Sequence, residues 1–72
     1  MPTQIELLIS GAVDKMIEKL MHDYNATFSW SMNAIFRSNT YQRLLSNSSF
    51  RTESPLYIYE NLIKELQSKH IL

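Results

Sequence analysis

The sequence predicts an all-α fold, either an antiparallel helical hairpin or a small four-helix bundle, with two long helices and two short helices between them. Apolar residues recur every three or four positions near both ends of the chain. Helix-start signals precede these stretches. The only alternating run, residues 56–59, lies inside a helical pattern, so no strand is predicted. Residues 1–72 are expected to form a single helical domain.

The first long helix is predicted to begin near Gln4, after a capping box made by Thr3 and Glu6. It should end around Asp23 to Asn25, because asparagine tolerates the left-handed conformation. Gly11 lies inside it, either to admit a close neighbour or because it is tolerated. Charged and polar residues recur every four positions on the side expected to face water. The opposite, apolar face comprises Ile5, Leu8, Ile9, Ala12, Val13, Met16, Ile17, Leu20 and Met21.

Two short helices are predicted in the middle of the chain. The first, residues 28–37, follows a cap at Thr27 or Ser29 and is expected to be buried. The second starts at residue 39 or 40 after a cap at Ser38 and ends at residue 45. Residues 46–49 are predicted to form a loop, which Phe50 anchors to the core. The residues expected to point inward are Phe28, Met32, Ile35, Phe36, Tyr41, Leu44 and Leu45.

The last long helix has the clearest start signal in the sequence. Ser54 can cap its first turn, and Pro55 suits the first helical position because its missing N–H would have no helical partner there. The helix should extend to about Lys69. Its predicted buried face carries Leu56, Tyr59, Leu62, Ile63 and Leu66.

Composition argues against catalysis and against a cofactor. Seven basic and seven acidic residues cancel, and there is no cysteine. The single glycine cannot build a phosphate-binding loop. Asp14, Glu18 and His22 share a helix face, but they are interpreted as a solvated stripe, so no metal site is predicted. We therefore expect a non-enzyme with no small-molecule substrate. The absence of cysteine, of a leader segment and of a long apolar run favours a cytoplasmic, non-membrane protein.

A nucleic-acid-binding role is the alternative hypothesis. Residues 24–52 contain Arg37, Arg43 and Arg51 and no acid. The two short helices could form a helix-turn-helix in which the segment from Ser38 to Arg43 reads DNA. Zero net charge and the short second helix make nucleic acid the less favoured partner.

Protein binding is the leading hypothesis. A 72-residue chain buries little surface, so self-association as a homodimer, or association with another protein, would add to its core. Tyrosine and tryptophan are common at interfaces because a rigid apolar ring carries a polar tip. Trp30, Tyr57 and Ile58 are the predicted partner-binding residues.

Residues 28–66 resemble small uncharacterised bacterial helical proteins. The shared pattern is a serine, a tyrosine and a leucine spaced three apart, Ser38, Tyr41 and Leu44, followed by the segment Glu53-Ser54-Pro55-Leu56-Tyr57-Ile58-Tyr59-Glu60. The resemblance implies an accessory or antitoxin-like, partner-binding role, since such proteins are encoded beside toxin-antitoxin-like cassettes. Asn47-Ser48-Ser49 departs from the more acidic, glycine-containing turn of that pattern.

Overall fold

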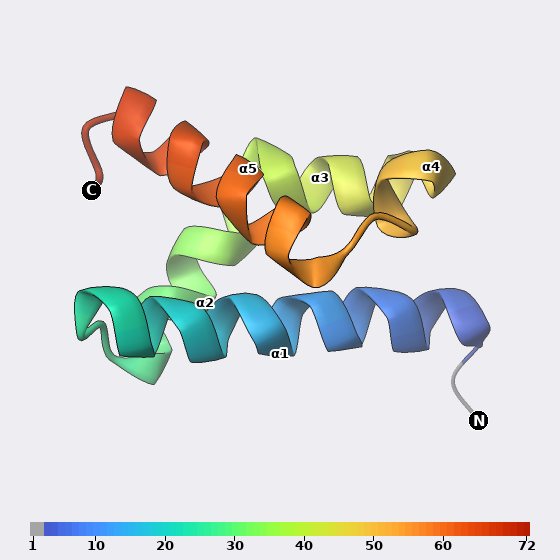
Figure 1. Cartoon of the computed structure of the whole chain (residues 1–72), viewed down its shortest axis with the longest axis horizontal. Helices are drawn as coiled ribbons and strands as arrows, with labels where there is room; N and C mark the ends of the chain where they lie inside the picture. The colour runs from blue at the N-terminus through green and yellow to red at the C-terminus, as the bar shows by residue number, and fades with distance from the viewer. Residues whose placement is uncertain (1–2) are drawn as a thin grey trace.

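The structure, a computed structural model, describes residues 3–72, and within that range the chain forms helices and no strand. The helices are α1 (Gln4–Tyr24), α2 (Phe28–Phe36), α3 (Asn39–Ser46), α4 (Ser48–Arg51) and α5 (Pro55–Ser68) (Figure 1). The all-α prediction is therefore confirmed. None of the helices in this range has both the length and the apolar character needed to cross a membrane.

Four helix starts follow the capping signals in the sequence. The hydroxyl oxygens of Thr3, Thr27, Ser38 and Ser54 each accept a hydrogen bond from the backbone N–H three residues later, over 3.0–3.2 Å. Each cap satisfies one of the amides that a helix leaves unpaired at its start. Asn25 ends α1 in the left-handed conformation, at φ 54°. These local predictions are confirmed.

The predicted loop at residues 46–49 is wrong. Ser46 is the last residue of α3, and residues 48–51 form the one-turn helix α4. The side chain of Asn47 accepts a hydrogen bond from the N–H of Phe50 over 3.0 Å, so it caps a new helix. Phe50 is buried, as predicted, but it lies in α4 rather than beyond a loop.

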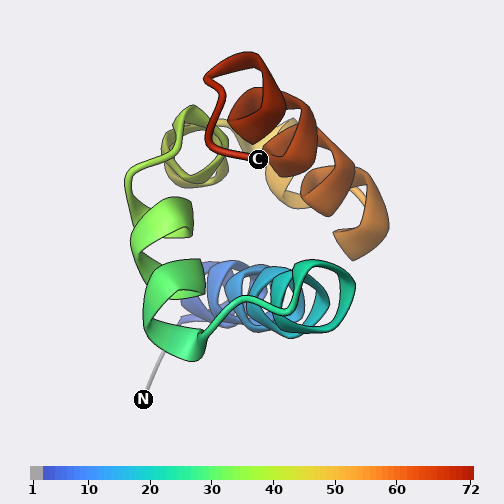
Figure 2. The ribbon, with the colours of Figure 1, turned by 90° about the vertical axis from the view of Figure 1, so that its left-hand side faces the viewer.

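The helices form two layers joined at one side. α1 makes one layer, α3, α4 and α5 make the other, and α2 rises between them (Figures 1 and 2). α1 and α5 run in the same general direction (Figure 1), so the predicted antiparallel hairpin of the first and last helices is wrong. The cause is α2, which carries the chain into the second layer. Within that layer α3 and α5 are the antiparallel pair.

One core lies between the two layers. Its α1 side is formed by the C-terminal two thirds of that helix, and α5 supplies most of the opposite side. The small side chain of Ser31 is fully buried and lets α2 lie close to its neighbours. The buried apolar residues are Ala12, Val13, Met16, Ile17, Leu20, Ile35, Leu44, Phe50, Ile58, Tyr59, Leu62 and Leu66.

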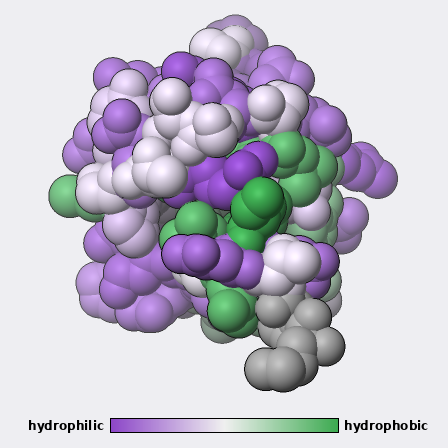
Figure 3. All heavy atoms as spheres, turned by 90° about the vertical axis from the view of Figure 1, so that its right-hand side faces the viewer, coloured by the Kyte–Doolittle hydropathy of each residue, from purple (hydrophilic) through white to green (hydrophobic). Residues whose placement is uncertain are grey.

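Several residues that were expected to point inward are exposed. Figure 3 views the molecule from the end where α1 begins and shows hydrophobic side chains lying open there among hydrophilic ones. Periodicity identified the apolar faces correctly, but no neighbouring element covers these parts of them. The predictions corrected here concern Ile5, Leu8, Met21, Phe28, Phe36, Leu45 and Leu56, each at least 40% exposed.

Candidate functional site

A groove of about 470 Å³ opens between α1 on one side and α2 and α3 on the other. We call it the α1/α2 groove. It lies beside the N-terminal two thirds of α1, because α2 packs close to α1 only nearer the C-terminal end of that helix. Apolar side chains dominate it. Its lining residues are Glu6, Ile9, Ser10, Val13, Asp14 and Ile17 from α1, with Phe28, Met32, Phe36, Tyr41 and Leu45 opposite.

The wall facing α1 is a continuous aromatic and aliphatic stripe. Phe28, Met32 and Phe36 follow each other at four-residue spacing and so lie on one side of α2. Phe36 continues onto α3 through Tyr41, whose ring meets it edge to face with 4.9 Å between the ring centres. This contact fixes two rings at the groove wall while leaving 43% of Phe36 exposed. Helical periodicity predicts this stripe in the core, whereas the structure leaves it beside an open groove.

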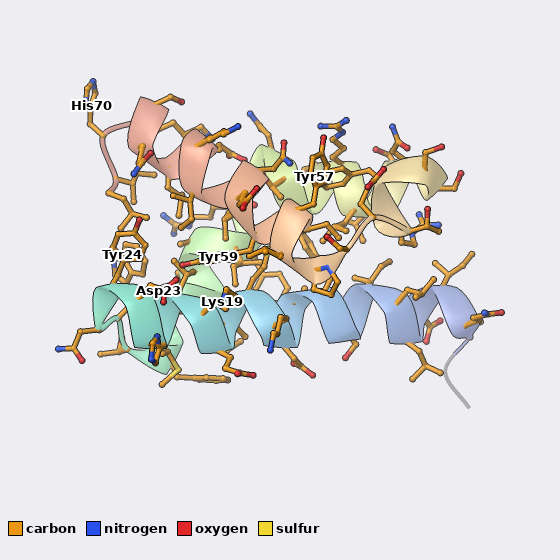
Figure 4. The ribbon with its side chains drawn as sticks, viewed as in Figure 1. Lys19, Asp23, Tyr24, Tyr57, Tyr59 and His70 are labelled. Atoms are coloured by element: carbon orange, nitrogen blue, oxygen red, sulfur yellow. The ribbon has the colours of Figure 1, made fainter. Side chains whose placement is uncertain are left out.

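The three predicted partner-binding residues lie apart. Ile58 is 1% exposed and belongs to the core, so a partner cannot reach it in this fold. Trp30 is half-buried and lines hollows near the chain's C-terminal residues. Tyr57 is exposed and lies on the side of α5 away from α1 (Figure 4), where its ring packs against Phe50. The predicted set therefore does not form one surface.

Two of the three predicted nucleic-acid contacts are used within the chain. Arg51 donates hydrogen bonds to the backbone carbonyls of Leu44 and Leu45, over 3.0 and 2.9 Å, at the end of α3. The guanidinium of Arg43 lies 4.2 Å from the ring centre of Phe50, a cation–π contact. Arg37 is exposed at the end of α2. Arg43 and Arg51 thus stabilise the α3–α4 turn, and no contact within residues 3–72 favours the helix-turn-helix hypothesis.

Glu65 accepts four hydrogen bonds from its own chain, and its place in the sequence gives no sign of this role. Its carboxylate accepts hydrogen bonds from the backbone N–H groups of Asn39 and Thr40, over 2.7 and 2.8 Å, and from the Thr40 hydroxyl, over 2.7 Å. Lys69 donates a fourth bond over 2.6 Å. The acid therefore binds the N-terminus of α3, where a negative charge is favoured.

The pKa of Glu65 reflects these bonds. Burial alone raises it, but the bonds from Lys69, from the Thr40 hydroxyl and from the two backbone amides outweigh burial and bring the pKa to about 2. The carboxylate is therefore ionised at neutral pH and fully occupied by donors of its own chain. This arrangement clamps α5 to α3 and does not create a reactive acid.

A second polar cluster joins α1 to α5 (Figure 4). The Tyr59 hydroxyl donates to Asp23 over 3.0 Å, and Lys19 lies 5.6 Å from the Tyr59 ring centre. The contact with His22 at 2.9 Å, then the bond from Tyr59, lower the pKa of Asp23. Burial, then the bond to Asp23, raises the pKa of the Tyr59 phenol. The phenol stays protonated and acts as a donor that holds the helices together.

The polar stripe of α1 behaves as a solvated face. Asp14, Glu18 and His22 are all exposed, and Lys15 pairs with Glu18 over 3.6 Å. Within residues 3–72, no group of three or more histidine, cysteine, aspartate or glutamate side chains is placed to hold a metal ion. The α1/α2 groove is thus the feature of the described surface whose composition points most directly to a ligand.

Comparisons with protein-family models, with curated proteins and with solved structures return no match to this chain.

Proposed function

We propose that this chain is a small non-catalytic binding protein that holds a segment of another protein in the α1/α2 groove. The observation that supports this most strongly is the aromatic wall. Phe28 and Phe36 are 55% and 43% exposed, although the same chain buries a core of apolar residues between its two layers. Large aromatic side chains left open beside a groove are typical of protein-binding surfaces.

The chain has the exposed surface area of an ordinary folded monomer. Its solvent-accessible surface is 4832 Å², close to the roughly 4,700 Å² expected of a folded monomer of this mass. The surface area therefore gives no reason to treat the groove as half of a core that a second copy completes. We propose another protein as the partner, with self-association as the competing outcome.

The proposal includes a role in the cell and a compartment. The resemblance of residues 28–66 to small bacterial proteins implies an accessory or antitoxin-like role, in which the chain would cover a segment of its partner. We also place this role in the cytoplasm, because a chain without cysteine suits a reducing compartment.

Position-specific photo-crosslinking in the native cell tests the proposal. A photoreactive phenylalanine analogue replaces Phe36 in the groove or, as the matched control, Leu56, which is similarly exposed but outside it. We expect a discrete protein adduct from the Phe36 position and none from Leu56. Adding Phe28→Ser should abolish the adduct by removing part of the wall. Equal labelling at both positions, or no adduct at Phe36, would contradict the proposal.

A further inference from the structure

The occupant of the α1/α2 groove must satisfy its own backbone hydrogen bonds. Both walls of the groove are helices, whose N–H and C=O groups are already paired with each other. Within residues 3–72 there is no strand, and so no sheet edge to which an extended peptide could add. A helix brings its backbone already paired and offers only side chains to its neighbours. The groove therefore favours a helical occupant, because a helix needs no backbone hydrogen bonds from the groove walls.

The length of the groove sets the length of that helix. Its α1 wall runs from Glu6 to Ile17, which at 1.5 Å per residue is about 17 Å, or roughly three helical turns. The α2 wall presents residues four apart, a spacing that packs well against side chains at positions i, i+3 or i+4, and i+7 of a neighbouring helix. An amphipathic helix of about three turns matches both walls.

The charge along the groove is of one sign. Among residues 3–72, the charged residues that line it are Glu6 and Asp14, and both lie on α1. Lys15 and Lys19 project from a different side of that helix, where Lys15 pairs with Glu18 and Lys19 approaches Tyr59. Within residues 3–72, neither groove carboxylate forms an ion pair. The groove therefore combines an apolar interior with an acidic rim.

This charge pattern disfavours a second copy of the chain as the occupant. In the symmetric arrangement in which the two grooves face each other, a two-fold axis would place one α1 against the other. The α1 helices would then cross with Glu6 and Asp14 facing the same acids of the other copy, which is unfavourable. A partner that carries lysine or arginine at those positions has no such penalty.

From these contacts we infer that the groove binds a basic amphipathic helix of another protein. Its apolar side packs on Phe28, Met32 and Phe36, and its lysine or arginine side chains meet Glu6 and Asp14. Those two acids are eight residues apart, about 12 Å along α1, so the basic residues of the occupant should be two turns apart. This inference rests on the proposed function and specifies the chemistry of the partner.

Two synthetic helical peptides provide the test. Both carry leucine at positions i, i+4 and i+7. One has lysine two turns apart beside the leucines, and the other has glutamate at the same positions. Binding of the full chain is measured by fluorescence anisotropy in low salt and in 0.5 M NaCl. We expect the lysine peptide to bind about tenfold more tightly in low salt, as two exposed ion pairs would give. The preference should shrink in high salt because screening weakens exposed pairs.

Two double variants that remove the same charge test whether the groove acids cause the preference for the lysine peptide. Glu6→Gln with Asp14→Asn should reduce the tenfold preference to less than threefold. Glu53→Gln with Glu60→Gln removes the same charge outside the groove and should leave the preference within twofold of the wild type. Equal effects of the two double variants would overturn the inference, because net charge alone would then explain the selection.

The remaining outcomes separate this inference from the proposed function. If the two peptides bind equally, or neither binds, the inference of a basic helix is overturned. The proposed function would still stand on a groove-specific adduct at Phe36. If that adduct is absent, the proposed function fails regardless of the peptides. Sedimentation that shows a dimer lost on Phe36→Ser would assign the groove to a second copy and overturn the inference.

Discussion

The two halves of α1 have the same amphipathic pattern but different surroundings. In the C-terminal half, Leu20 is fully buried in the core. In the N-terminal half, Leu8 is 42% exposed, and residues 3–8 are all exposed. From Ala12 to Leu20 the rest of the chain covers the apolar face, whereas the first turns of the helix are left open beside the α1/α2 groove. The comparison shows that a periodic apolar face identifies what is available for burial, whereas neighbouring elements decide what is buried.

The same substitution in each half gives the largest expected effect. Leu20→Ala should lower the free energy of unfolding by about 3 kcal/mol, because it leaves a cavity in a closed core. Leu8→Ala should change it by less than about 0.5 kcal/mol, because its side chain is already partly solvated. Urea denaturation followed by circular dichroism measures both. Similar losses for the two variants would mean that the N-terminal half of α1 is covered in solution.

Glu65, which joins α5 to the start of α3 in the layer opposite α1, offers the next largest effect. Glu65→Gln keeps the shape of the side chain but removes its charge at the start of α3 and its pair with Lys69. Bonds from charged groups contribute more than neutral ones, so the loss should be about 2 kcal/mol at pH 7. Urea denaturation measures it. Glu60→Gln, an exposed acid on the same helix, is the control and should have little effect.

The pH dependence of that loss follows from the lowered pKa. Glu65 has a pKa of about 2 in the folded chain, against an ordinary value of 4.5. Its contribution to stability is therefore complete above about pH 5 and is lost as the pH falls through 4.5 toward 2. The stabilities of wild type and Glu65→Gln should converge over this interval. A difference in the free energy of unfolding between wild type and Glu65→Gln that stays constant down to pH 2 would show that the charge of Glu65 does not cause the stabilisation.

Local features of the fold could be predicted from the sequence, and non-local ones could not. The caps at Thr3 and Ser54 depend on residues within one turn, which the sequence displays directly. The clamp joins Glu65 to Asn39 and Thr40, which precede it in the sequence by 26 and 25 positions. Nothing in the local pattern of α5 marks that acid. The α4 helix was missed because asparagine and serine suit both a loop and a cap.

The candidate site was predictable in its residue types but not in its position. The sequence analysis identified Phe28 and Phe36 as one apolar side, and this grouping is correct. It could not show that the side lies beside α1 without being covered, because that depends on where α2 crosses between the layers. For the same reason Ile58 was expected at a surface, although the direction of α5 turns it into the core.

The bond between Tyr59 and Asp23 should have a smaller effect than the clamp. Tyr59→Phe keeps the buried ring and removes only the donor to Asp23. We expect a loss of about 1 kcal/mol in the free energy of unfolding, the usual net value of one hydrogen bond. Thermal denaturation measures it. Tyr57→Phe, at an exposed position of the same helix, should be nearly neutral. An equal loss for both would show that the hydroxyl of Tyr59 does not stabilise the α1–α5 contact.

Gly11 gives the smallest expected effect, and its sign is opposite. Apart from Gly11's own chain neighbours and the backbone of its helix, no atom of residues 3–72 lies within 4 Å of the position that a Cβ would occupy, so Gly11 is a tolerated glycine and not a point of close helix approach. Gly11→Ala should therefore stabilise the chain by about 0.5–1 kcal/mol, since alanine loses less conformational freedom in a helix.

Hydrogen exchange can show where that stabilisation acts. Amides in the N-terminal half of α1 should exchange more slowly in Gly11→Ala, because little besides helix propensity protects them. Gly11 does not line the α1/α2 groove, so peptide binding should be unchanged. A destabilised variant would mean that another surface lies against this side of α1 in solution. The open half of the helix would then be closed by association after all, and the contrast between the two halves would disappear.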